Sequence, residues 1–260
     1  MKERIKERAF SSPILSAISV SLFAVVIFSI PGIFKLQKNG LFYLHIVCRT
    51  VAAAGALILA KICGFKVFSK PKFTSSAILL TLLGLLVCVN NFPIIGFSTG
   101  NVKLLNDPET VKYLCYCAAI GIAEELIFRG FILSLVGVGL KGKKYAPLLT
   151  VAVSAAIFSF CHLFNIFSAG LLPTLLQVGY TFLTGCLFGT VYLFTENVIF
   201  PILLHIVYDV GGLIFTDPFG IAVGNMWDTY TVIITVVLGV ATAIIFSIAL
   251  CRFRLSCHNE

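Results

Sequence analysis

The stretch AEELIFRG, Ala123 to Gly130, places two glutamates and an arginine inside an apolar run that extends over residues 112–139. Charged side chains at membrane depth cost about 2.5–3.5 kcal/mol each on insertion scales, so they are rare there and mark function. The rest of the chain indicates that this run is a membrane segment, because 59% of the 260 residues are hydrophobic and only 12% are charged. Soluble domains carry about 25% charged residues. The composition therefore predicts an all-α, polytopic membrane helix bundle.

Working outward from this stretch, we expect about eight transmembrane helices in one integral-membrane domain that covers residues 1–260. A helix that crosses the hydrocarbon core needs roughly 20 apolar residues. The candidate segments are residues 13–34, 41–64, 74–98, 112–139, 146–168, 171–195, 197–215 and 229–251. The motif NNFP (Asn90 to Pro93) predicts a break in the third segment. The short link TEN between the sixth and seventh predicts a tight antiparallel hairpin.

The charge distribution predicts the orientation of the bundle. The net charge is +8, and the basic residues gather in the N-terminal tail and in the connections near Lys66 and Lys143. Membrane topology and anionic headgroups explain this pattern, and no motif indicates nucleic-acid binding. By the positive-inside rule, we expect both termini to face the cytoplasm, with the protein in the cell (plasma) membrane. The nine cysteines show no CxxC pairing and are interpreted as small buried residues.

Helix geometry separates the roles of the two adjacent glutamates. Neighbouring residues project about 100° apart on a helix, so Glu124 and Glu125 cannot face the same point. Arg129 follows Glu125 by four residues, the favourable order for an ion pair within a helix. The sequence therefore predicts an internal Glu125–Arg129 pair and leaves Glu124 free to face a cavity.

Two further segments present polar groups that complete a candidate site. His205 and Asp209 are four residues apart and share one helix face, as do Phe158 and His162. A carboxylate and two imidazoles in a low-dielectric cavity are the groups needed to activate water, because the carboxylate accepts a proton and the imidazoles donate to an oxyanion or bind a metal. A structural clamp and a proton relay use the same residue types and remain open alternatives.

Two polar residues of the second segment are interpreted as structural. A single transmembrane histidine such as His45 is more often a helix–helix hydrogen-bonding group than a catalyst. Arg49 is expected to snorkel toward the interface or to pair with a carboxylate, without a functional role.

Three motifs together resemble those of one known family. EELIFR (Glu124 to Arg129) is similar to the EExxxR motif of the CAAX-protease and bacteriocin-processing (CPBP, or Abi) intramembrane endopeptidases. FSFCH, ending at His162, resembles their FxxxH motif, and HIVYD, His205 to Asp209, resembles HxxxN or HxxxD. The motifs occur in the family's order and lie within residues 113–215. The resemblance implies an eight-helix membrane bundle with a water-accessible cavity, similar to the type II CAAX prenyl endopeptidases.

The resemblance also implies roles for the matched residues. Glu124 would be the general base that activates water, His162 would position that water, and His205 and Asp209 would line the oxyanion side. An aspartate can donate to an oxyanion only when it is protonated, so Asp209 would be neutral, orient His205, or bind a metal with it.

The supporting residues implied by the same motifs are Glu125, Arg129 and Phe158. Two histidines and a carboxylate also fit an open catalytic zinc site, whose ligands would be Glu124, His162 and His205. The resemblance favours the route without metal.

The expected function is hydrolysis of a membrane-associated peptide or lipidated protein by glutamate-activated water. The resemblance implies bacteriocin self-immunity or CAAX-type processing as the setting. Cys161 adjoins His162 but projects about 100° away on a helix, which argues against a thiol nucleophile. The alternative is a membrane immunity or scaffold protein without catalytic activity, in which the same polar cluster is structural.

Overall fold

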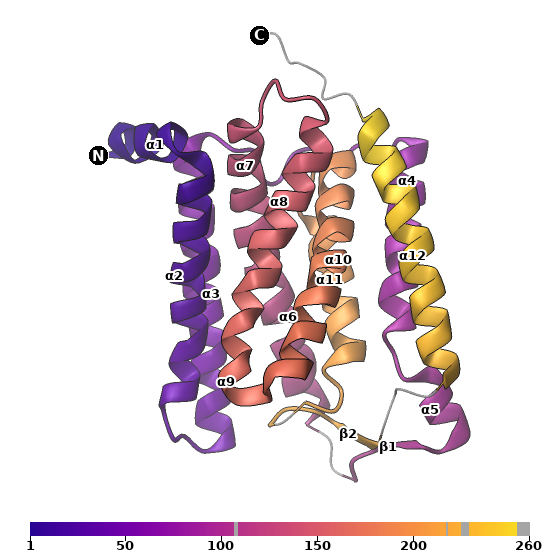
Figure 1. Cartoon of the computed structure of the whole chain (residues 1–260). Coiled ribbons are helices and arrows are strands. Elements are labelled where there is room, and N and C mark those ends of the chain that lie inside the picture. The colour runs from indigo at the N-terminus through magenta and orange to yellow at the C-terminus, as the bar shows by residue number, and fades with distance from the viewer. Residues whose placement is uncertain (107–108, 217, 225–228, 254–260) are drawn as a thin grey trace.

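The computed structural model describes residues 1–106, 109–216, 218–224 and 229–253, and it is a helical bundle with one small sheet (Figure 1). The helices are α1 (Lys2–Ser11), α2 (Pro13–Ile33), α3 (Lys38–Cys63), α4 (Ser75–Asn90), α5 (Ile94–Thr99), α6 (Thr110–Glu125), the π-helix η1 (Leu126–Leu133), α7 (Ser134–Gly139), α8 (Ala146–Cys161), the 3-10 helix η2 (His162–Asn165), α9 (Ile166–Ala169), α10 (Leu171–Thr195), α11 (Ile199–Gly212) and α12 (Thr229–Arg252). The all-α bundle predicted from composition is confirmed.

Within the described residues, six helical stretches are long and apolar enough to cross a membrane. They are Pro13–Ile33, Lys38–Cys63, Ser75–Thr99, Ala146–Ala169, Leu171–Thr195 and Thr229–Arg252. The predicted segment 112–139 consists of three consecutive pieces, α6, η1 and α7. The predicted segment 197–215 contains α11, whose 14 residues span only about 21 Å. The structure therefore supports a polytopic bundle without confirming the count of eight.

The predicted helix breaks are present. Helix α4 ends at Asn90 and α5 begins at Ile94, immediately after Pro93. Proline disfavours the helical conformation of the residue before it, which explains the break. The link between α10 and α11 consists of residues 196–198, as the predicted hairpin requires.

A small antiparallel sheet was not predicted. Strand β1 (Val102–Leu104) pairs with β2 (Ala222–Gly224), which joins the loop before α6 to the loop after α11. The sheet lies at the end of the bundle opposite α1 (Figure 1). The sheet therefore links α6 and α11, the two helices that carry most of the candidate site.

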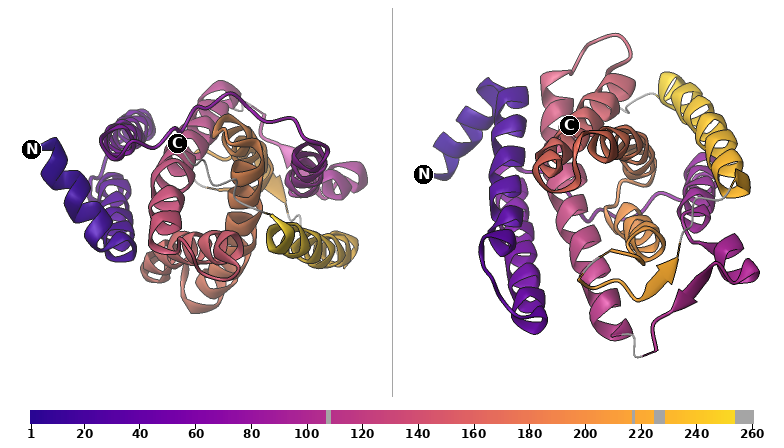
Figure 2. Two further views of the ribbon diagram at one scale, coloured as in Figure 1. Left: turned by 90° about the horizontal axis from the view of Figure 1, so that it is seen from above. Right: turned by 60° about the horizontal axis from the view of Figure 1, so that its bottom comes forward.

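The centre of the bundle is η1, all of whose residues are buried. A helix that is apolar and buried all round forms the core of a bundle. Helices α2 and α3 flank one side of this central group, and α4 and α12 flank the other (Figure 2). Large apolar side chains on these outer helices point outward, among them Phe23, which is 66% exposed, and Val237, which is 63% exposed. An exposed apolar surface of this kind suits contact with lipid.

Helix α1 extends sideways from the top of α2, at the edge of the bundle (Figure 1). The sequence prediction had treated these residues only as a basic tail before the first span. Pro13 occupies the first turn of α2, where its fixed φ and missing N–H are tolerated. The last turn of α12 lies at the same end of the bundle as α1 (Figure 1).

Candidate active site

The candidate site begins at the end of α6, where Glu124 and Glu125 precede η1. Gly121 lies one turn earlier and packs directly against α11. A Cβ atom at this position would lie 2.9 Å from Ile206 Cγ1 and 3.1 Å from the Ile206 backbone nitrogen. The absence of a side chain at Gly121 therefore allows α11 to approach α6 closely enough for His205 to reach the glutamates.

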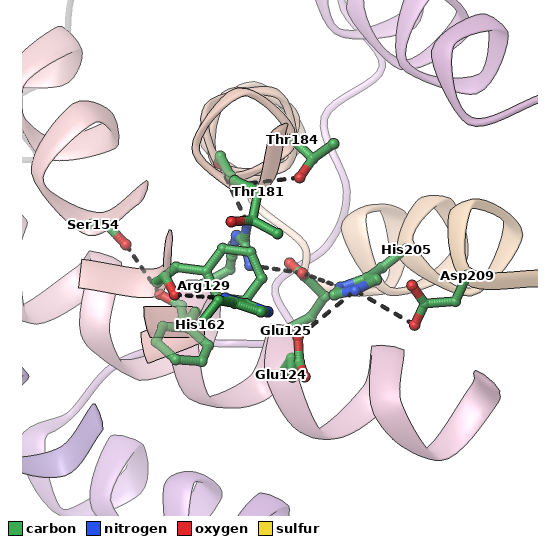
Figure 3. Close-up of polar contacts among 12 residues, drawn as sticks. Glu124, Glu125, Arg129, Ser154, His162, Thr181, Thr184, His205 and Asp209 are labelled. Atoms are coloured by element: carbon green, nitrogen blue, oxygen red, sulfur yellow. Dashed lines mark hydrogen bonds and ion pairs between the residues drawn. The ribbon is translucent and has the colours of Figure 1, made fainter. Parts of the chain in front are cut away.

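Glu125 is the centre of a buried polar network. Its Oε1 atom accepts hydrogen bonds from Arg129 Nη1 and from His205 Nδ1, both at 2.7 Å (Figure 3). The Glu125 side chain is fully buried and that of Arg129 is 2% exposed. The predicted Glu125–Arg129 pair is present. The bond from His205 was not predicted, and it gives Glu125 a second task, which is to orient the imidazole.

Arg129 ties this network to two other helices. Its Nη2 atom donates to the backbone carbonyl of Gly185 on α10 at 3.3 Å. Its guanidinium lies 4.7 Å from the ring centroid of Phe158 and 5.5 Å from that of Phe188. Contacts of this type stabilise a cation without supplying a second negative charge.

The second ring nitrogen of His205, Nε2, is directed toward two carboxylates. This atom lies 3.8 Å from Glu124 Oε2 and 3.6 Å from Asp209 Oδ2 (Figure 3). Both distances exceed an ordinary hydrogen bond, and separations of this size are commonly bridged by water. The buried Asp209 Oδ2 has no hydrogen-bond partner among the described residues. The shorter contact that orients His205 therefore comes from Glu125 rather than from Asp209.

His162 lies where α8 gives way to η2, and its ring is held from one side. Nδ1 lies 3.2 Å from the carbonyl oxygen of Phe158. Because a carbonyl only accepts, Nδ1 must be the donor, and in the neutral ring Nε2 keeps its lone pair. The ring of Phe158 also packs edge-on against His162, with centroids 5.1 Å apart. Phe158 thus positions His162 through both its backbone and its side chain.

One cavity of about 750 Å³ connects these groups. It is lined by all of the residues predicted to be catalytic: Glu124, His162, His205 and Asp209. Ligand pockets commonly have volumes of about 300–1,000 Å³, so the space is sufficient for a short peptide segment. The structure brings the predicted side chains together, while their chemical roles stay predictions.

Several other cavity residues were not singled out from the sequence. They are polar but uncharged side chains from α4 and the residue that follows it, and from α6, η2, α10 and α11: Asn90, Asn91, Tyr116, Asn165, Gln177, Tyr180, Thr181, Thr184 and Tyr208. The signal was present as polar residues within apolar segments, for example in QVGYTFLTG (Gln177 to Gly185). Amides and hydroxyls of this kind provide donors and acceptors for a peptide backbone.

The interpretation of Arg49 as a snorkelling or carboxylate-paired residue was wrong. Arg49 is only 8% exposed and lines the cavity. Its Nη1 atom donates to His45 Nδ1 at 2.8 Å, and the ion pairs found among the described residues do not include Arg49. His45 likewise bonds within its own helix rather than across to another.

The suggested zinc ligands Glu124, His162 and His205 line the same cavity. Within the described part of the chain, however, no group of three or more His, Cys, Asp or Glu side chains is arranged to hold a metal ion. The three side chains are therefore not arranged as a zinc centre in this structure.

The fold and the site together define a class of protein: a membrane-embedded helical bundle with a buried acid–imidazole cluster on the wall of an internal cavity. Residues 106–211 match the family model described as type II CAAX prenyl endopeptidase Rce1-like. This match covers the part of the chain that carries the three motifs, and it supports the assignment to the CAAX-protease (CPBP) family of membrane peptidases that they predicted. The protein is an integral membrane protein. Comparisons with curated proteins and with solved structures give no match.

Proposed function

We propose that this protein is an intramembrane endopeptidase that hydrolyses membrane-associated peptides with water activated by Glu124. The observation that carries the proposal is the position of Glu124. Its carboxylate is 15% exposed on the cavity wall, 3.8 Å from His205 Nε2, whereas its neighbour Glu125 is fully buried and committed to Arg129 and His205. A carboxylate that is accessible, free of an ion pair with arginine, and next to the His205 imidazole suits a general base.

In the proposed reaction, water lies between Glu124 and His162. Glu124 accepts a proton from the water, and the Nε2 lone pair of His162 accepts a hydrogen bond that orients it. The oxygen attacks the carbonyl carbon of the peptide and forms a tetrahedral oxyanion. The C–N bond then breaks, Glu124 returns its proton to the departing amine, and the products are a carboxylic acid and an amine.

The oxyanion is stabilised by His205 and Asp209. His205 in its imidazolium form donates through Nδ1 to Glu125 and through Nε2 to the oxyanion. Asp209 in its protonated form adds a second donor, since a buried carboxylate without a hydrogen-bond partner is costly and would repel the oxyanion. Membrane association of the substrate follows from the location of the cavity within the bundle, and a lipidated protein is one such substrate.

The proposal predicts that His162→Ala lowers kcat/KM by about 10²-fold or more, because positioned acid–base groups typically contribute 10²–10⁴-fold. The purified protein is incubated in bilayer discs with a mixture of apolar peptides in H₂¹⁸O, and products are identified by mass spectrometry. Hydrolysis by water places the heavy oxygen in the new carboxyl group.

The matched control is Cys161→Ala, because Cys161 adjoins His162 and lines the same cavity while its thiol donates to the Ile157 carbonyl. This variant should cleave at a rate near that of the wild type. Loss of activity in Cys161→Ala with full activity in His162→Ala would replace the water mechanism by a thiol mechanism. A folded wild type that cleaves no peptide would favour the non-catalytic immunity or scaffold function.

We further propose that both termini face the cytoplasm in the cell membrane, because the basic connections gather at the end of the bundle that carries α1. The connection that follows α3 contains Lys66, and the connection between α7 and α8 contains Lys141 and Lys143; both connections lie at that end (Figure 1). Green fluorescent protein fused to the N-terminus should therefore fluoresce, and alkaline phosphatase fused there should be inactive. The reverse pair of results would invert the orientation.

A further inference from the structure

A second buried arginine lies on the cavity wall, outside the residues that match the family model. Arg49 is in the middle of α3, is 8% exposed, and contributes to the same cavity as Glu124. Its guanidinium carbon lies 5.0 Å from the ring centroid of Tyr116 and 5.5 Å from that of Phe28. Both aromatic rings therefore contact the guanidinium and hold it in place.

The charge of Arg49 is not neutralised by its partner. Arginine only donates, so His45 Nδ1 must accept the 2.8 Å bond from Nη1, and this requires a lone pair on Nδ1 and therefore a neutral imidazole. The Nε atom of Arg49 is buried and has no hydrogen-bond partner among the described residues. Arg129, the other buried arginine among the described residues, has Glu125 as a direct counter-ion at 2.7 Å.

A buried cation without a counter-ion is costly, and an unpaired N–H adds to that cost. One bond to His45 holds the guanidinium in place, and the remaining N–H groups of Nη1 and Nη2 are suited to an anion. A guanidinium binds a carboxylate through parallel N–H donors in a fixed planar geometry. Asn90 and Asn91 line the same cavity with neutral amides, and the carboxylates on its wall are Glu124 and Asp209, neither of which forms an ion pair with Arg49 among the described residues.

The separation between Arg49 and Glu124, the candidate catalytic base, matches the length of a few peptide residues. Tyr116, against which Arg49 packs, precedes Glu124 by eight residues on α6, a rise of about 12 Å along the helix. An extended peptide covers about 3.3–3.6 Å per residue, so three or four residues span this interval. A carboxylate held at Arg49 would thus lie a few residues from the bond placed at Glu124.

We propose that Arg49, positioned by His45 between Phe28 and Tyr116, is a specificity subsite that binds a carboxylate of the peptide substrate. The proposal rests on the peptidase function proposed above and assigns a residue that determines which peptides are held. Two carboxylates have this chemistry, the free C-terminus and an acidic side chain.

The test measures binding separately from cleavage. The Glu124→Gln protein is titrated with three forms of one apolar octapeptide that carries a neutral N-terminal dansyl group: the C-terminal acid, the C-terminal amide, and the amide with one glutamate near its end. We expect the acid, the glutamate peptide or both to bind about 10-fold or more tightly than the neutral amide. Whichever carboxylate peptide binds tightly identifies the source.

Adding Arg49→Gln should erase the difference between the carboxylate peptides and the neutral amide, and Arg49→Lys should restore part of it, because the charge returns without the planar fork. His45→Ala should reduce the preference selectively, and it provides the test if Arg49→Gln does not fold. Equal affinity of the Glu124→Gln protein, which keeps Arg49, for all three peptides would overturn the proposal. A loss in Arg49→Gln that is the same for charged and neutral peptides would also overturn it, since general charge balance in the cavity predicts that pattern.

The outcomes for the subsite and for the peptidase are distinguishable. A carboxylate preference that depends on Arg49, without hydrolysis by the wild type, would keep the subsite and remove the peptidase. Hydrolysis by the wild type without any carboxylate preference would do the reverse.

Discussion

Glu124→Gln is expected to abolish peptide hydrolysis and to leave the bundle folded. The substitution keeps the size and polarity of the side chain but removes its ability to accept a proton. Glu124 forms no ion pair with arginine or lysine among the described residues and lies on the cavity wall, so little packing is lost. Removing a positioned general base typically costs 10²–10⁴-fold, and we expect a loss of about 10³-fold or more in kcat.

The measurement is single-turnover cleavage of a peptide that the wild type hydrolyses, with thermal unfolding to verify the fold. Glu196→Gln is the matched control, because Glu196 makes an exposed ion pair with Lys72 at 2.7 Å, outside the cavity. This control should retain the wild-type rate. Wild-type cleavage by Glu124→Gln would remove Glu124 from the mechanism.

Much of the site was predictable because it depends on short-range geometry. The spacing between Glu125 and Arg129 is local to one helix, and the structure has the expected ion pair. The positions of the apolar segments also followed from composition and length. The order of these segments along the chain determined which helices carry polar residues at membrane depth.

Other features depend on contacts between distant residues. The hydrogen bond between Glu125 and His205 joins residues 80 apart in sequence, and it requires the close approach of α11 at Gly121. A glycine in an apolar segment is compatible with many packing arrangements, so its partner could not be inferred. The cavity position of Arg49 was missed for the same reason, because the helix face that α3 turns inward is set by its neighbours.

Secondary structure departed from prediction where the chain carries the site. The predicted segment 112–139 changes to a π-helix directly after Glu125, and α8 changes to a 3-10 helix at His162. Both changes redirect side chains relative to a regular α-helix, and such irregularities are frequent at functional sites. An apolar pattern alone gives no signal for them.

The second large effect is expected from Glu125→Ala, which should strongly destabilise the bundle. Glu125 is the direct acceptor for two buried donors, Arg129 and His205. Removing one partner of a buried pair leaves an uncompensated charge and typically costs about 3–5 kcal/mol. We expect a large fall in the thermal unfolding midpoint and in the yield of folded protein.

The double variant Glu125→Met/Arg129→Met separates the charge from the packing. Replacing both members of a buried pair by apolar residues is often neutral or stabilising, so this variant should unfold closer to the wild type than Glu125→Ala does. It should still be inactive, because His205 Nδ1 has lost the carboxylate that orients it. Lys72→Ala, which breaks an exposed pair, should cost at most about 1 kcal/mol. If Glu125→Ala and Lys72→Ala were equally stable, Glu125 would behave as a solvated residue. A solvated glutamate could orient neither Arg129 nor His205, so this result would contradict the network.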